Sequence, residues 1–110
     1  MHLTFDTLTD HQQTIIRLQG EIDVYTAPNL KDALMPLVKV TGQHVLVDCQ
    51  KVTYMDSTGL GVFIGALKAT KSYGSRMTLI NLQERIYRLF TITGLDQVMD
   101  VNLLIKGGNE

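Results

Sequence analysis

The residue types that could do chemistry gather in residues 54–61, which read Tyr-Met-Asp-Ser-Thr-Gly-Leu-Gly. The Asp-Ser-Thr triplet at 56–58 favours the start of a helix, because its side-chain oxygens can accept hydrogen bonds from the free backbone N–H groups there. Gly59 and Gly61 follow, although glycine costs about 0.5–1 kcal/mol relative to alanine inside a helix. The glycines therefore indicate that the backbone comes close to another element or to a partner. A hydroxyl at a helix start is also where a phosphate group is electrostatically favoured.

Ser57 could be a hydrolase nucleophile, a helix cap or a regulated hydroxyl. A nucleophile elbow has glycine two residues before the serine, and Met55 stands there instead. The histidines are His2, His11 and His44, and the last begins a predicted strand whose far end leads to Ser57. The sequence therefore disfavours hydrolysis. The residue chemistry alone favours a simple N-cap over a regulated hydroxyl.

Glycines at 59, 61 and 65 follow a predicted strand and open a predicted helix, as in a dinucleotide-binding loop. Their spacing differs from that fingerprint by one residue. Asn81, and not a carboxylate, stands at the end of the next predicted strand. The pattern disfavours nucleotide binding, and we expect no cofactor.

Metal binding is also disfavoured, because no pair of His or Cys residues has the spacing of metal ligands. Asp23, Asp48 and Asp56 could converge at one edge of a sheet, but caps and loop ends explain them more simply. Cys49 is expected to be a small buried or half-buried residue. We therefore expect no metal site.

The length and the charge limit the class of protein. A chain of 110 residues with a formal net charge of −1 is expected to be one domain, spanning residues 1–110, that does not bind nucleic acid. The single cysteine fits a reducing compartment. The longest apolar run, residues 60–67, is too short to cross a membrane. No signal peptide is recognisable, so the expected location is cytoplasmic.

The first half of the chain predicts two strands, a helix and a third strand. Residues 3–5 and 13–18 alternate and are expected to form a hairpin around the turn at 9–12. A helix is expected to begin after an N-cap at Thr26, and Pro36 is expected to kink or shorten it. The apolar middle of strand 44–48 predicts burial on both faces.

The second half continues the alternation of helices and strands. A helix over residues 59–72 is apolar over a wide arc, so part of it is covered by a neighbouring helix or is free for a partner. A parallel strand at 76–80 and a helix at 83–93 follow; residues 98–104 are ambiguous, and a frayed tail is expected from about 106. The order ββαβαβα predicts an α/β fold, a mixed β-sheet with packed α-helices.

Three segments carry a family resemblance. They are residues 20–25 (Gly-Glu-Ile-Asp-Val-Tyr), residues 54–61, and residues 88–95, in which Arg-Leu-Phe and Thr-Gly-Leu occur. The chain resembles the anti-sigma factor antagonists of the STAS domain family from about Leu3 to Val101, and is most similar to the general-stress type. The Asp-Ser-Thr-Gly-Leu-Gly segment is the most specific part of the resemblance.

The resemblance implies partner switching and no enzymatic activity of this chain. The unphosphorylated antagonist would bind an anti-sigma factor that is also a serine kinase, and so free the sigma factor. The kinase would use ATP to phosphorylate Ser57 and release the antagonist, and a serine phosphatase would reset it. Asp23 is expected to lie beside Ser57 and to matter for this exchange. As a partly solvated loop residue it is expected to add little to stability.

The resemblance also assigns a partner-binding surface. Its residues are Glu21, Asp23, Asp56, Ser57, Thr58, Gly59, Leu60, Gly61 and Val62. The alternative is a ligand-binding or structural interaction module of the STAS type without phospho-switching, in which Ser57 only caps the helix.

Overall fold

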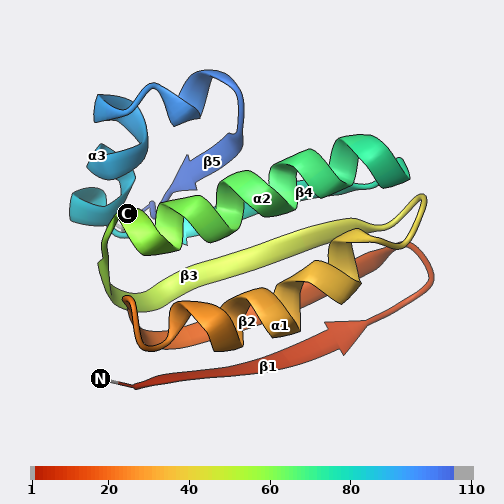
Figure 1. Ribbon diagram of the computed structural model, residues 1–110, viewed down its shortest axis with the longest axis horizontal. Coiled ribbons are helices and arrows are strands. Elements are labelled where there is room, and N and C mark those ends of the chain that lie inside the picture. The colour runs from red at the N-terminus through yellow and green to blue at the C-terminus, as the bar shows by residue number, and fades with distance from the viewer. Residues whose placement is uncertain (1, 106–110) are drawn as a thin grey trace.

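A five-stranded mixed sheet forms the centre of the molecule, in the spatial order β1-β2-β3-β4-β5 (Figure 1). The computed structural model describes residues 2–105. β1 is antiparallel to β2, and the other neighbouring strands are parallel. The strands are β1 (Leu3–Thr9), β2 (Gln13–Ile22), β3 (His44–Met55), β4 (Arg76–Leu82) and β5 (Asp100–Leu103).

The predicted N-terminal hairpin is confirmed. Asp10 shapes its turn, because the Asp10 Oδ1 atom accepts hydrogen bonds from the backbone N–H groups of Gln12 and Gln13, both at 3.1 Å. The predicted parallel pairing of strands 44–48 and 76–80 is also confirmed, with Val45 opposite Met77. The ambiguous segment 98–104 contains the short edge strand β5, which extends the predicted order.

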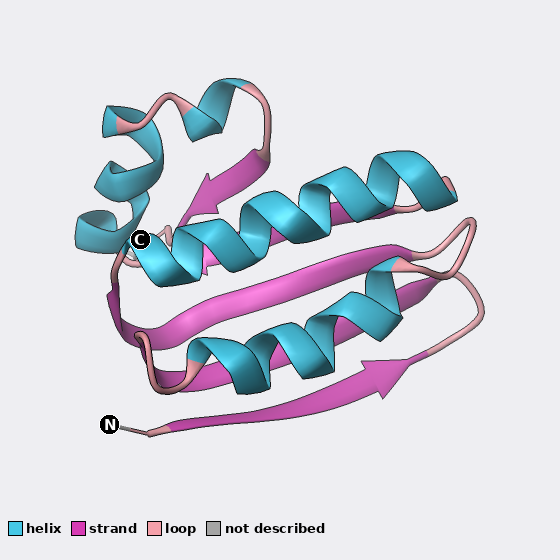
Figure 2. Cartoon of the chain, in the orientation of Figure 1, coloured by secondary structure: helices cyan, strands magenta, loops and turns pink. Residues whose placement is uncertain are grey.

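Helices α1 (Ala27–Val38) and α2 (Ser57–Tyr73) lie side by side over one face of the sheet (Figure 2). Along β3, Val45, Val47 and Cys49 face these helices and are fully buried, whereas Leu46 and Asp48 between them are partly exposed. The prediction that this strand is buried on both faces is therefore wrong. Its apolar run is covered on one side only, because both long helices cross on the same face.

The third helix, α3 (Glu84–Ile92), and the short 3₁₀ helix η1 (Leu95–Gln97) precede β5. The ring of Phe90 on α3 lies 6.5 Å from the ring of Phe63 on α2, with both rings fully buried. Through this aromatic contact, α3 packs against the hydrophobic core. No helix within residues 2–105 has the length and apolar character needed to cross a membrane.

Two expectations about α1 concern Pro36 and Thr26. Pro36 does not end the helix, which continues to Val38. Pro36 and Asp32 are both exposed, so water can satisfy the Asp32 carbonyl that proline leaves unpaired. The N-cap predicted at Thr26 is confirmed in position: its carbonyl accepts from the Leu30 N–H at 3.1 Å, although its side chain makes no capping hydrogen bond. The frayed tail predicted from about residue 106 lies outside the described residues.

Candidate functional site

The segment that carries residues 54–61 turns from the end of β3 into the start of α2. β2 and β3 are parallel, and Ile22 pairs with Met55 at their carboxyl ends. The Asp56 N–H donates to the Ile22 carbonyl at 3.3 Å. The loop that begins with Asp23 and the turn that holds Asp56 therefore leave neighbouring strands at the same end of the sheet.

Ser57 is the first residue of α2 and is exposed. The N-cap is Asp56, whose backbone is extended (φ −119°, ψ −170°) and whose Oδ1 accepts from the Thr58 N–H at 2.9 Å. The interpretation of Ser57 as the cap is therefore wrong. Within the described residues no hydrogen bond engages the Ser57 hydroxyl, so this side chain can be approached from solvent.

Asp23 is buried, with 6% of its surface exposed. Its Oδ1 accepts from the Tyr25 N–H at 2.9 Å and from the Thr26 N–H at 3.0 Å. The Thr26 hydroxyl donates to the Glu21 carbonyl at 2.7 Å and accepts from the Asp23 N–H at 2.9 Å. The expectation that Asp23 is partly solvated is wrong, because its carboxylate is buried and organises the loop between β2 and α1.

That loop presents two apolar side chains to solvent. Val24 is 59% exposed and Tyr25 is 79% exposed, at the tip that Asp23 and Thr26 hold. Reasoning from the sequence did not assign either residue to the site. The signal was an Asp three residues before a Thr, a pattern typical of side chains that bond to nearby backbone groups.

The two glycines of α2 differ in their surroundings. A Cβ atom on Gly59 would lie 2.7 Å from Ile22 Cγ2 and 2.8 Å from Met55 Cγ, so Gly59 allows the helix to meet the strand ends. A Cβ atom on Gly61 would have no neighbour within 4 Å. Close approach to another element therefore explains Gly59, and the space over Gly61 is open.

The remaining residues of the expected surface are divided between solvent and core. Thr58 is exposed and Val62 is partly exposed, but Leu60 is only 7% exposed and packs in the core. An open hollow of about 350 Å³ lies between α1 and α2 and is lined by Lys31, Met35, Thr58, Gly61, Val62 and Gly65. The wide apolar arc of α2 is thus partly covered by α1 and partly open from Thr58 to Gly65.

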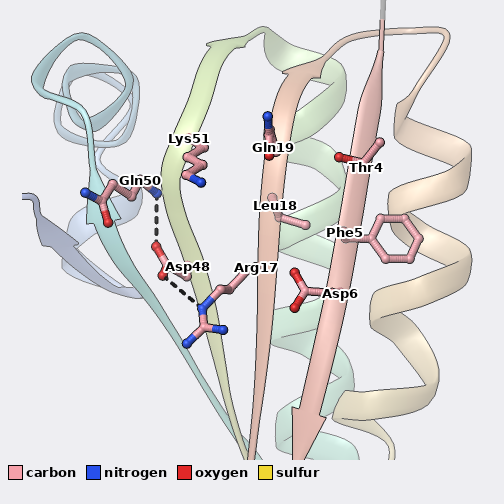
Figure 3. Close-up of a pocket in the computed structure, with 9 residues that line it drawn as sticks. All are labelled: Thr4, Phe5, Asp6, Arg17, Leu18, Gln19, Asp48, Gln50 and Lys51. Atoms are coloured by element: carbon pink, nitrogen blue, oxygen red, sulfur yellow. Dashed lines mark hydrogen bonds and ion pairs between the residues drawn. The ribbon is translucent and has the colours of Figure 1, made fainter.

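A second hollow, of about 540 Å³, lies on the sheet face away from α1 and α2 (Figure 3). Arg17 Nε lies 3.8 Å from Asp48 Oδ2 there, and Asp48 Oδ1 accepts from Asn81 Nδ2 at 3.2 Å. Asp48 therefore lies in the middle of β3, where it contacts Arg17 and Asn81. It does not lie with Asp23 and Asp56 at the end of the sheet. Among residues 2–105 no cluster of His, Cys, Asp and Glu could hold a metal ion.

Two other candidate reactive groups lie away from Ser57. His44 begins β3, whereas Ser57 follows the end of that strand, so the strand separates them. Cys49 is fully buried as expected, and burial raises the pKa of its thiol well above its ordinary value, with a further contribution from Asp48.

Residues 4–106 match the family model for the STAS domain. The chain belongs to the STAS domain family. The predicted resemblance is thereby confirmed. The chain is 42% identical over 108 residues to the anti-sigma-B factor antagonist of Bacillus subtilis (strain 168), which covers 98% of each chain. It is 40% identical over 102 residues to the protein of the same name from Staphylococcus aureus (strain NCTC 8325 / PS 47), covering 93% of this chain and 94% of the relative.

Solved structures confirm the predicted α/β fold of this STAS domain. An anti-sigma factor antagonist from Mycobacterium paratuberculosis superposes with a TM-score of 0.81 at 20% identity, over 92% of this chain and 86% of that one. The unphosphorylated form of the anti-sigma factor antagonist SpoIIAA superposes with a TM-score of 0.74 at 20% identity, over 89% and 87% of the two chains. At these identities the similarity concerns the fold alone.

Proposed function

We propose that this STAS domain is an anti-sigma factor antagonist whose binding to an anti-sigma factor serine kinase is switched off by phosphorylation of Ser57. The observation that carries the proposal is the exposed Ser57 hydroxyl at the first position of α2, where Asp56 already supplies the cap. Relatives named anti-sigma-B factor antagonists, 40–42% identical over nearly the whole chain, support the same role. The chain acts in the cytoplasm as a binder and a substrate, not as an enzyme.

The partner-binding surface is centred on the start of α2. Its accessible part comprises Glu21, Asp56, Ser57, Thr58, Gly61 and Val62, all of which are exposed or partly exposed. Three further residues of the expected surface are buried and support it from beneath: Asp23, Gly59 and Leu60. The open space over Gly61 allows the backbone of the partner to come close to α2.

The covalent step joins the Ser57 oxygen to the γ-phosphorus of ATP held by the kinase. The bond between that phosphorus and the β,γ-bridging oxygen breaks, ADP leaves, and the hydroxyl proton passes to a base of the kinase. A serine phosphatase later transfers the phosphoryl group to water. Each step changes only the group on the Ser57 oxygen.

The switch is local and electrostatic. A phosphate brings about −1.5 to −2 charges at pH 7. At a helix N-terminus this charge is stabilised by about 0.3–1 kcal/mol, so the phosphorylated domain stays folded. Against the kinase the same charge would be desolvated beside Asp56, and an unpaired buried charge costs several kcal/mol. Binding to the kinase is therefore lost while the fold is kept.

The experiment is incubation with the candidate kinase and ATP, followed by intact-mass measurement and phosphopeptide mapping. We expect a gain of one phosphoryl group that maps to Ser57, is absent in Ser57→Ala and persists in the matched variant Thr58→Ala. Phosphate mainly on Thr58, or no phosphate on a chain that binds the kinase, would refute phospho-switching at Ser57. The second result would favour a STAS-type interaction module without a switch.

A further inference from the structure

Among residues 2–105, no strand pairs with the outer side of β1, which is one edge of the sheet. β1 pairs with β2 over its whole length, from Leu3 opposite Gly20 to Thr9 opposite Thr14, without a shift in register. The other side of β1 faces away from the sheet (Figure 1). Edge strands are usually protected by lysine, proline or a bulge. β1 contains neither lysine nor proline, and Asp6 is its single charged residue.

Two hydrogen bonds determine which backbone groups of β1 are free. The Glu21 N–H donates to the His2 carbonyl at 2.8 Å, and the Asp10 N–H donates to the Gln13 carbonyl at 2.9 Å. In an antiparallel pair every second residue is hydrogen-bonded to the partner strand. The even-numbered residues of β1 therefore bond to β2. The residues whose N–H and C=O groups point outward are Leu3, Phe5, Thr7 and Thr9.

Apolar side chains accompany these free backbone groups. Phe5 lies opposite Leu18, so it is on the sheet face that α1 covers, yet 40% of its surface is exposed. Phe5 also lines an open hollow beside Asn29, Asp32 and Ala33 of α1. The middle of the free edge thus offers an aromatic ring together with unpaired backbone donors and acceptors.

We propose that a second copy of this chain adds its own β1 to this edge, antiparallel and about a two-fold axis. The joined sheet is continuous through both copies. An edge that pairs with its own copy supplies the same donors, acceptors and side chains from both sides. The proposal concerns a surface other than the start of α2 and does not depend on the function proposed above.

The positions of Phe5 and Asp6 select the register of this pairing. Outward-facing residues must lie opposite one another, so a symmetric pair centres on one residue of β1. Centring on Asp6 would place two carboxylates directly opposite, which is destabilising. Centring on Phe5 places the two rings side by side, sets Leu3 against Thr7, and faces Asp6 with Thr4. Three bonded pairs then give about six hydrogen bonds across the axis.

The geometry leaves the start of α2 accessible in both copies. β1 and β2 lie between the free edge and β3, so two strands separate that edge from the strand that leads into the turn holding Ser57. The antiparallel arrangement points the carboxyl ends of the two β3 strands in opposite directions. Pairing through one strand buries less than a standard interface, so the dimer is expected to be weak and to populate at about 0.1–1 mM.

The first test is sedimentation equilibrium from about 20 μM to about 1 mM, a range that brackets a weak interface. We expect the apparent mass to rise toward twice that of the monomer. Thr7→Pro removes an N–H that faces outward and leaves the bonds to β2 intact, and proline is tolerated at such edge positions. It should weaken association at least about tenfold, whereas the matched control Thr7→Val should associate like the parent chain.

Amide hydrogen exchange identifies the surface. Exchange at Leu3, Phe5 and Thr7 should slow as concentration rises, while exchange at Thr4, Asp6 and Leu8 should not change with concentration. A chain that stays monomeric at about 1 mM, where a weak interface would be populated, would overturn the proposal. So would a folded Thr7→Pro variant that dimerises like Thr7→Val, or concentration-dependent protection confined to other elements.

Discussion

Replacing Asp23 by alanine tests whether its carboxylate stabilises the loop between β2 and α1. The carboxylate is buried and accepts the N–H groups of Tyr25 and Thr26 through one oxygen. Alanine removes that acceptor. The Thr26 N–H lies in a buried environment, and the Tyr25 N–H lies in a partly buried one.

The expected cost follows from these two donors. A buried donor left without a partner costs about 1–3 kcal/mol, and a partly buried one can recover part of this from water. We expect Asp23→Ala to lower the free energy of unfolding by about 2–3 kcal/mol. For a domain of this size each kcal/mol shifts the thermal midpoint by about 4 °C, so the midpoint should fall by about 8–12 °C.

The assay is urea and thermal denaturation of the purified chain at pH 7, with two companion variants. Asp23→Asn keeps an oxygen acceptor and should retain most of the stability. Glu21→Ala changes a partly exposed neighbour and should stay within about 0.5 kcal/mol of the parent. An Asp23→Ala midpoint equal to that of Glu21→Ala would refute the argument, because it would show that the loop does not depend on this carboxylate.

Three further predictions concern the site and the far end of β3. Ser57→Asp should keep the circular dichroism spectrum and the thermal midpoint but lose kinase affinity at least about tenfold; an unfolded variant, or parental affinity in titration calorimetry, would contradict it. Gly59→Ala should destabilise the chain, whereas Gly61→Ala should hold or raise stability and weaken kinase binding; equal denaturation midpoints would contradict the assignment. Burial, together with Arg76, lowers the pKa of His44 below its ordinary 6.5 against an opposing effect of Asp100, so the unfolded chain binds more protons. Stability should therefore fall as pH drops through 6.5, and a His44→Gln variant with the same pH profile would show that other groups are responsible.

The sequence was sufficient for the order of the elements, because local signals define them. The Asp10 turn lies between two alternating strands, and an apolar strand leads into a helix at the Asp-Ser-Thr triplet. Which face of β3 is covered could not be predicted in this way. Leu46 is as apolar as its neighbours, and only the passage of α1 and α2 on one side leaves it partly exposed.

The sequence did not indicate the burial of two residues assigned to the partner-binding surface, Asp23 and Leu60. Asp23 is a carboxylate in a loop, and such groups are usually solvated; its burial depends on the Thr26 hydroxyl bridging back to the Glu21 carbonyl. Leu60 lies within the expected surface but faces inward, because the phase of α2 is set by its packing on the sheet. Both cases concern side-chain direction, which tertiary contacts determine.

The fit of Gly59 against Ile22 and Met55 makes the start of α2 dependent on the interior of the domain. A methyl group can enter at position 59 only if Ile22 shrinks and Met55 moves aside, so the effects of substitutions at these three positions will not be additive. The result is epistasis between a surface turn and two core residues on different strands. A chain that diverges at Ile22 thereby changes which residues its turn can later accept, without any change at the exposed serine.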